Sequence, residues 1–310
     1  MKFRKMALAV LAATGLAIAP AIAEQRVSIG TGGTGGLFYV IGAGMADVLN
    51  RHMDNTTARA EVTGASVENI RRVAADQMTF GFSSSSTLYE ASVGDGPFEQ
   101  ALPVAGMAYL YPAVLQIATI EGTGIETMED LAGKRINLGP PGSNAAVLAQ
   151  RLLEAYGVFE PGNAQFLSYA EGTGAIINGN LDATVVLAGA PTAALIDLGA
   201  QRDMKLISVD ADTVAAMLEE FPFYQVYEIP AETYSGQAEA VTVINDPATL
   251  FVKADADEEL VYSITKALFD NLDELAEIHP QARAIALETA TNSPVDLHPG
   301  AQRYFDEAGR

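Results

Sequence analysis

The sequence predicts an α/β fold with two lobes, and three observations support this. The chain has 310 residues, of which 49% are hydrophobic, so it is long enough to bury two cores. Short apolar strands alternate with helical segments, which favours parallel sheets covered by helices. The pattern restarts near residue 120 and changes near residue 250. We therefore expect one lobe from 24–117 plus 248–310 and another from 118–247, joined by extended crossings near 113–120 and 241–253.

In the first lobe, apolar residues recur at helical spacing directly after a short alternating strand and a glycine-rich loop. Ser66 is expected to cap a helix that runs to about Gln77. The expected elements are, in order, a strand at 26–30, a helix at 37–52, a strand at 58–63, a helix at 66–77, and strands at 79–82, 102–109 and 113–120.

The second lobe repeats the strand, loop and helix order with shorter elements. A long amphipathic helix at 258–277 and a helical tail return the chain to the first lobe. The expected elements are, in order, a short helix at 127–131, a strand at 135–138, a helix at 145–156, a strand at 165–168, a short helix at 175–179, a strand at 184–187 followed by a helix, a strand at 205–209, and an extended segment at 241–253.

The N-terminus is typical of a secretory signal peptide. Lys2, Arg4 and Lys5 precede an apolar run of about 14 residues, and Ala21 and Ala23 are the small residues at the −3 and −1 positions of a cleavage site. The run is shorter than the roughly 20 residues that span a bilayer, so an anchor is not expected. The sequence therefore predicts export of residues 24–310 to a bacterial periplasm, with cleavage of 1–23.

Composition excludes several classes of function. The net charge is −21, from 18 basic and 39 acidic residues, which argues against a nucleic-acid or anionic-membrane binder. There is no Cys, and His52, His279 and His298 are far apart in the sequence. Thiolate chemistry and a metal site are therefore not expected, and no cofactor is predicted.

Small polar loops follow strands in both lobes, at 31–36, 64–66, 83–86, 142–144 and 189–191. Glycine allows the backbone to approach a ligand closely. N–H groups at a helix start carry about half a positive charge and bind an anion without Lys or Arg. Since ligands bind at the carboxyl ends of strands in open α/β sheets, these loops predict a site for a small carboxylate.

The sequence disfavours two other kinds of site. Residues 30–35 match the dinucleotide motif G-x-G-x-x-G, but Asp47 lies within a helix and Glu61 is expected inside a strand, so neither suits a ribose. A hydrolase would need a base beside its nucleophile, and no His accompanies Ser143 or the serines at 83–86. His298 is expected to pack or to cap a helix. The sequence therefore predicts a binding protein and not an enzyme.

Taken in order, the motifs of the mature chain resemble the TAXI family of substrate-binding proteins of TRAP transporters. The resemblance covers essentially the whole mature chain and rests on GTGGTGGLFYVIG (30–42), TGASVENIRRVA (63–74), GPPGSN (139–144), AGAPTAAL (188–195), FPFY (221–224), IPAETYSGQ (229–237), VYSITKALFDNLDEL (261–275) and LHPGAQRYF (297–305). It implies a type II-like periplasmic binding-protein fold that closes on a small organic acid. It also implies delivery to TRAP membrane permease subunits, driven by an ion gradient, by a protein that is monomeric.

The resemblance also implies which residues contact the ligand. The first loop would supply amides and hydroxyls, Tyr39 an aromatic wall, Ser66 and Asn69 hydrogen bonds, and Pro191 the far wall. The full set is Thr31, Gly32, Gly33, Thr34, Gly35, Tyr39, Ser66, Asn69, Ser84, Ser85, Gly142, Ser143, Asn144, Gly189 and Pro191.

Two departures from the family pattern bear on the ligand. Ser84, Ser85 and Ser86 stand where the family often has a Gln-Ser-Asp-like triplet, and Asn144-Ala145 replaces a Gly-Thr pair. A missing carboxylate at Ser86 would leave a ligand ammonium unpartnered. We therefore expect 2-oxoglutarate or a dicarboxylate rather than glutamate. A sensor input that passes the ligand signal to a kinase is the alternative function.

Overall fold

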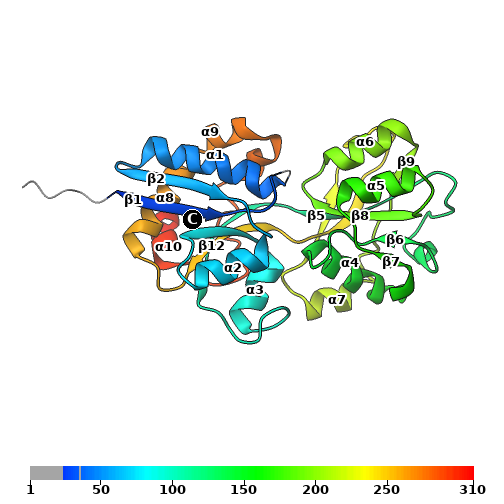
Figure 1. Cartoon of the computed structure of the whole chain (residues 1–310), viewed down its shortest axis with the longest axis horizontal. Coiled ribbons are helices and arrows are strands. Elements are labelled where there is room, and N and C mark those ends of the chain that lie inside the picture. Colours follow the sequence, from blue (N-terminus) through cyan, green and yellow to red (C-terminus); the bar gives the residue numbers. More distant parts are fainter. Residues whose placement is uncertain (1–23, 35) are drawn as a thin grey trace, which may run out of the picture.

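The computed structural model describes residues 24–34 and 36–310, and it contains two sheets that lie at the two ends of an elongated molecule (Figure 1). The expected signal peptide and Gly35 lie outside the described residues. Helices cover both sheets, so the two-lobed α/β fold predicted from the sequence is confirmed. Within the described ranges, no helix has both the length and the apolar character needed to cross a membrane.

The sheet of the first lobe has the strand order β2-β1-β3-β12-β4. Strand β1 runs parallel to β2 and β3, whereas β12 is antiparallel to β3 and β4. The strands are β1 (Gln25–Gly30), β2 (Thr56–Glu61), β3 (Phe80–Ser84), β4 (Val104–Tyr111) and β12 (Ala248–Lys253). The helices are α1 (Leu37–His52), α2 (Ser66–Ala74), α3 (Ser85–Val93), α8 (Glu258–Phe269), α9 (Leu272–Ile278), η3 (Pro280–Ala284) and α10 (Pro299–Glu307).

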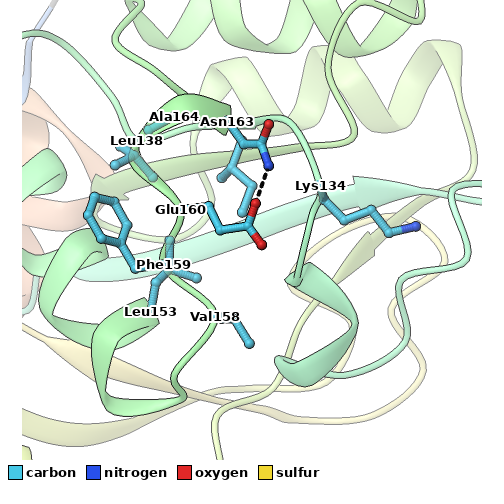
Figure 2. Close-up of a pocket in the computed structure, with 9 residues that line it drawn as sticks. Lys134, Leu138, Leu153, Val158, Phe159, Glu160, Asn163 and Ala164 are labelled. Atoms are coloured by element: carbon cyan, nitrogen blue, oxygen red, sulfur yellow. Dashed lines mark hydrogen bonds between the residues drawn. The ribbon is translucent and has the colours of Figure 1, made fainter.

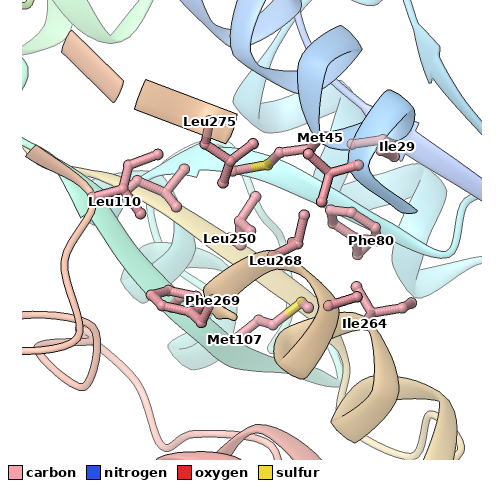
Figure 3. Close-up of a cluster of buried hydrophobic side chains, with 14 of the residues drawn as sticks. Ile29, Met45, Phe80, Met107, Leu110, Leu250, Ile264, Leu268, Phe269 and Leu275 are labelled. Carbon is pink, nitrogen blue, oxygen red and sulfur yellow. The ribbon is translucent and has the colours of Figure 1, made fainter. Parts of the chain in front are cut away.

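Apolar side chains on one face of this sheet form the first core with α1, α8 and α10, and the other face packs against α2 and α3. Helix α1 turns Ile41, Met45 and Val48 toward the sheet, because residues three or four apart share a helix face. Burial of each such side chain stabilises the fold by about 1.5–3 kcal/mol relative to exposure. Figure 3 shows this cluster, which includes Ile29, Phe80, Met107, Leu110, Leu250, Ile264, Leu268, Phe269 and Leu275.

The sheet of the second lobe has the order β10-β11-β5-β8-β6-β7, and β9 pairs with β5. One face packs against α4 and α7, and the other packs against α5 and α6. The strands are β5 (Val114–Ile120), β6 (Ile136–Asn137), β7 (Ala164–Gln165), β8 (Ala183–Ala188), β9 (Met204–Leu206), β10 (Gln225–Ile229) and β11 (Val241–Asn245). The helices are η1 (Glu129–Leu131), α4 (Asn144–Ala155), η2 (Pro161–Asn163), α5 (Tyr169–Ile177), α6 (Ala193–Gln201) and α7 (Ala215–Glu220).

The chain passes between the sheets twice, at Pro112-Ala113 and at Asp246-Pro247. The two crossings lie side by side, because the Asp246 N–H donates to the Ala113 carbonyl at 2.9 Å. From Val114 onward the chain already belongs to the second sheet. The junction between the lobes is therefore short, and each lobe keeps its own core.

Several sequence-based expectations were wrong in detail. The sheets are mixed and not parallel, because the strands that lead into or out of each crossing run against their neighbours. The expected extended segment at 241–253 is two strands in different sheets, separated by Asp246-Pro247. The expected helix at 258–277 breaks after α8, where the Asn271 amide donates to the Ala267 carbonyl at 2.8 Å. Strand β10 and helices α3 and α7 were not anticipated.

Candidate ligand-binding site between the lobes

The loop after β1 is anchored by Thr31 and exposed at its tip. The Thr31 side chain is fully buried, and its hydroxyl donates to the Glu61 carbonyl at 2.6 Å. Gly33 and Thr34 are exposed, and the Gly36 N–H donates to the Gly33 carbonyl at 2.8 Å. The first N–H groups of α1 begin here, and such groups lack partners within the helix. Thr31 therefore holds the loop, and its exposed tip is the part that can meet a ligand.

Asn69 ties together the ends of the first three strands. Its side chain is fully buried, and its amide nitrogen donates to the carbonyls of Thr31 (2.7 Å) and Phe82 (2.9 Å). Its oxygen accepts a hydrogen bond from the Thr63 hydroxyl at 2.7 Å. These bonds occupy the groups that the sequence analysis assigned to a ligand. In this structure Asn69 positions the loops.

Ser66 and Ser84 connect the second and third loops. The N-cap position of α2 is Ala65, at a φ of 69°, so the expectation that Ser66 caps this helix was wrong. The Ser66 hydroxyl instead accepts from the Ser84 N–H at 3.1 Å. Both serines are buried, which places the start of α2 against the end of β3.

The start of α3 is capped by a carboxylate from the second crossing. The Asp246 carboxylate accepts from the Ser86 N–H at 2.9 Å and from the Ser86 hydroxyl at 2.6 Å. The Ser85 N–H donates to the Pro247 carbonyl at 2.8 Å. Burial raises the pKa of Asp246 to about 6, against the lowering effect of the Ser86 hydrogen bonds.

Asp246 therefore corrects the premise that no carboxylate lies at Ser86. The sequence could not reveal it, because the two residues are 160 positions apart. Both carboxylate oxygens are bonded to Ser86, so this carboxylate is part of the junction between the lobes.

Asn144 joins the second lobe to this cluster. Its amide donates to the Ser86 hydroxyl at 3.2 Å and also to the Thr87 hydroxyl. The loop before it uses each residue differently. Gly142 takes a φ of 70°, in the left-handed region that favours glycine, and Ser143 caps α4 by accepting from the Ala146 N–H at 3.3 Å. The loop therefore starts α4 at a point that contacts the first lobe.

The loop after β8 reaches the first lobe on the other side of the crossings. Gly189 is buried, and a Cβ there would lie 2.5 Å from the Gln281 side chain of η3. A side chain at this position would displace the Gln281 side chain. Pro191 is exposed and follows a cis peptide bond, and Tyr39 is half-buried in the first turn of α1. The predicted residues of the second lobe thus meet the first lobe at two places.

Sequence reasoning missed a third contact between the lobes, centred on Arg151. Its guanidinium lies 2.8 Å from the Glu90 carboxylate of α3 and donates to the Tyr224 hydroxyl at 2.8 Å. It also stacks over the Phe221 ring, 4.0 Å from the centroid. Burial acts to lower the pKa of Arg151, but Tyr224 and Glu90 together raise it. The FPFY motif at 221–224 was the available signal.

Two cavities in the second lobe lie away from these residues. One, of about 10 Å³, has room for a single water and is lined by residues that include Lys134, Phe159 and Asn163 (Figure 2). In the same view, Asn163 donates to the Glu160 carboxylate at 2.6 Å. The other, of about 520 Å³, is a groove between α4 and α7. None of the predicted ligand-binding residues lines either cavity.

The remaining chemical candidates have structural explanations. His298 is buried and caps α10, with its Nδ1 accepting from the Gly300 N–H at 3.2 Å, so the expected capping role is confirmed. Burial lowers the pKa of His298.

Glu61 is the last residue of β2, whereas it was expected inside the strand, and its carboxylate pairs with Arg72 at 2.7 Å. Across 24–34 and 36–310, no three His, Asp or Glu side chains gather as a metal site.

Comparison with solved structures shows the same fold at low sequence identity. MatC from Rhodopseudomonas palustris with bound malate is 14% identical, with a TM-score of 0.55 over 91% of this chain and 97% of that one. A Xanthomonas citri protein bound to ATP is 9% identical, with a TM-score of 0.57 over 91% and 95%. The periplasmic aliphatic sulphonate binding protein SsuA from Escherichia coli is 14% identical, with a TM-score of 0.50 over 91% and 83%.

The fold is therefore that of two-lobed periplasmic binding proteins. The family model described as the NMT1-like family matches residues 29–309, which is nearly the whole described chain. The narrower resemblance to TAXI proteins stays a prediction. The chain belongs to the NMT1-like family.

Proposed function

We propose that this chain is a periplasmic solute-binding protein that captures a small carboxylate between its lobes and delivers it to the membrane permease of a TRAP transporter. The observation that carries the proposal is the contact of Asn144, at the start of α4, with Ser86, at the start of α3, at 3.2 Å. Loops that the sequence marked as ligand-binding in different lobes therefore lie against each other. Membership of the NMT1-like family and the fold support the same conclusion.

Binding would be coupled to a rotation of the lobes. Within residues 24–34 and 36–310 the chain crosses between the lobes at Pro112-Ala113 and at Asp246-Pro247, so few backbone bonds oppose a hinge motion. A ligand favours closure only through contacts that exist in the closed form. The exposed tip at Gly33 and Thr34 in one lobe and the exposed Gly142 in the other are suited to make such contacts.

Recognition of an anion would depend on local N–H groups. The net charge of −21 repels anions at long range, so the site must overcome this field at short range. The starts of α1 and α4 each offer unpaired N–H groups and a partial positive charge. Malate in MatC and the sulphonates that name SsuA are small anions, which is consistent with this chemistry in related folds.

The proposed location and partners follow from the N-terminus and the resemblance. Cleavage near Ala23 would release a soluble monomer, with lobes at 24–117 plus 248–310 and at 118–247. The monomer would present its ligand to TRAP permease subunits, and uptake would use an ion gradient and not ATP.

Calorimetry on the purified mature chain tests the proposal, together with mass spectrometry of any ligand that copurifies. We expect 1:1 saturable binding of a small carboxylate, with 2-oxoglutarate or a dicarboxylate bound more tightly than glutamate. If no carboxylate binds, or if the bound compound is converted to a product, the proposal is wrong. Tighter binding of glutamate would overturn only the ligand preference.

A further inference from the structure

Asn245 carries a buried polar atom that the fold leaves without a partner. It is the last residue of β11, directly before the second crossing, and its side chain is 2% exposed. Among the described residues, only its Oδ1 and the Tyr111 hydroxyl are enclosed side-chain atoms without a hydrogen bond. Tyr111 packs within the apolar core of the first lobe, whereas Asn245 lies at the junction of the lobes.

Strand geometry shows which way Asn245 faces. Side chains two residues apart share a face, so Asn245 lies on the same side of β11 as Val243. Val243 packs with Val114 in an apolar cluster that also contacts Ala190 and Tyr227. Ala190 directly follows Gly189 in the loop predicted to bind ligand. Asn245 therefore belongs to the face of the second lobe that carries this loop.

Tyr109 of the first lobe completes the surroundings of Asn245. Burial raises the pKa of Tyr109, the adjacent Asn245 side chain lowers it, and the nearby Tyr227 raises it again. These effects require the three side chains to lie close together, although Tyr109 belongs to β4 and Tyr227 to β10. Asn245 thus lies where the two lobes join, opposite Val114 of β5 and directly before the second crossing.

An enclosed carbonyl oxygen without a donor is unfavourable, and native folds rarely keep one without a reason. A ligand with an O–H or N–H group would supply the missing donor. The nearest carboxylate along the chain, Asp246, is buried and bonded to Ser86 through both oxygens, so it is not free to balance a ligand ammonium. A neutral hydroxyl is therefore the donor that suits this position.

We propose that Asn245 determines ligand specificity by accepting a hydrogen bond from a hydroxyl group of the ligand, so that the preferred solute is a hydroxycarboxylate. This inference rests on the proposed function, because it places a carboxylate between the lobes. The starts of α1 and α4 would recognise only the negative charge of the ligand. Asn245 would add recognition of its hydroxyl group.

Calorimetry with matched pairs that differ by one hydroxyl tests the inference. The pairs are malate with succinate, and lactate with propionate. We expect the wild type to bind the hydroxylated member of one pair at least about tenfold more tightly, because a site built to bond a hydroxyl rejects its deoxy analogue. In Asn245→Val the preference should fall to within about twofold. Thr242→Val, on the same strand but half-buried on the other face, should keep it.

Asn245→Asp keeps an acceptor and adds a negative charge. It should weaken binding of both members of a pair while preserving the preference for the hydroxyl, which a purely structural role of Asn245 would not produce. Melting curves identify any variant that fails to fold, and if Asn245→Val does so, Asn245→Asp decides the question.

The outcomes separate the two proposals. A wild type that binds succinate as tightly as malate, and propionate as tightly as lactate, overturns the role of Asn245 and leaves the proposed function intact. A hydroxyl preference that survives in Asn245→Val, or is lost in Asn245→Asp, also overturns it. A wild type that binds no carboxylate overturns the proposed function, and this inference fails with it.

Discussion

Arg151 and Glu90 form an ion pair between the lobes, with 2.8 Å between a guanidinium nitrogen and a carboxylate oxygen. Both side chains are largely buried, at 19% and 8% exposure. The pair lies on the side of the crossings where α3 meets α4. Because a charge left alone in such a place is costly, this contact holds the two lobes together on one side.

Replacement of Arg151 by Met should lower the free energy of unfolding by about 3–5 kcal/mol, because Glu90 would stay buried without a partner. The double variant Arg151→Met/Glu90→Gln should recover much of this loss. Urea unfolding measures the free energy of unfolding of both variants.

Arg135 is a matched control, because its ion pair with Asp182 is more exposed (48% and 24%) and lies within one lobe. Arg135→Met should cost much less than Arg151→Met, because a solvent-exposed ion pair contributes little to stability. Equal losses of unfolding free energy in Arg151→Met and Arg135→Met would contradict a stabilising role of the Arg151–Glu90 pair between the lobes.

The buried carboxylate of Asp246 should make stability depend on pH. Its pKa of about 6 in the folded chain exceeds the ordinary value near 4, so the folded state binds the proton more tightly. The contribution to stability is therefore fully present below about pH 4 and is lost as the pH rises through about 6, with a total near 3 kcal/mol.

Asp246→Asn removes this titration, so the wild type should lose stability relative to the variant between about pH 4 and pH 7. Urea unfolding of both proteins across this range measures the difference. The comparison cancels the effect of carboxylates whose pKa values are lowered by their partners, such as Asp182 beside Arg135 and Glu274 beside His52 and Arg51. A constant difference, or a wild type that gains relative stability with pH, would rule out a raised pKa at Asp246.

Ser143 and Ser168 are both N-caps, but only Ser143 lies beside the contact between the lobes. Ser143 accepts from the Ala146 N–H, and Ser168 forms a capping box with Glu171. Replacement of either by Ala should lower the free energy of unfolding by about 1 kcal/mol. Only Ser143→Ala should also weaken carboxylate binding in calorimetry. If both variants bind equally well, the start of α4 does not contact the ligand.

Asn69→Leu should destabilise the first lobe by about 2–4 kcal/mol, because the buried carbonyls of Thr31 and Phe82 would lose their donor. Thermal or urea unfolding measures this loss. Asn50→Leu is a useful comparison, since the exposed Asn50 bonds to the backbone of one residue, Ala58, donating to its carbonyl at 3.1 Å and accepting from its N–H at 2.7 Å. A cost for Asn69→Leu below that of Asn50→Leu would show that the bonds of Asn69 do not organise the loops.

Local patterns in the sequence predicted much of the fold. The helix expected at 37–52 has these bounds, because helical periodicity and the preceding glycines are visible within the segment itself. The two-lobed α/β arrangement followed from the same kind of signal, whereas α3, α7 and β10 were missed.

Long-range contacts could not be predicted in this way. The bonds of Asp246 to Ser86 and of Arg151 to Glu90 depend on how the sheets are joined, and no local pattern encodes this. Side-chain direction was also hidden. Asn69 was expected to face a ligand, but it turns inward, since an amide can satisfy three buried backbone and hydroxyl groups at once.

Distance measurement between the lobes tests the central claim most directly. The chain has no Cys, so Glu277→Cys on α9 and Asp197→Cys on α6 give two unique sites for spin labels. Both positions are exposed, and both helices lie at the top of Figure 1 in different lobes. Double electron–electron resonance should show a shorter distance with saturating malate, succinate or 2-oxoglutarate than without ligand. A carboxylate that saturates the protein in calorimetry but leaves the distance unchanged would contradict capture by closure of the lobes.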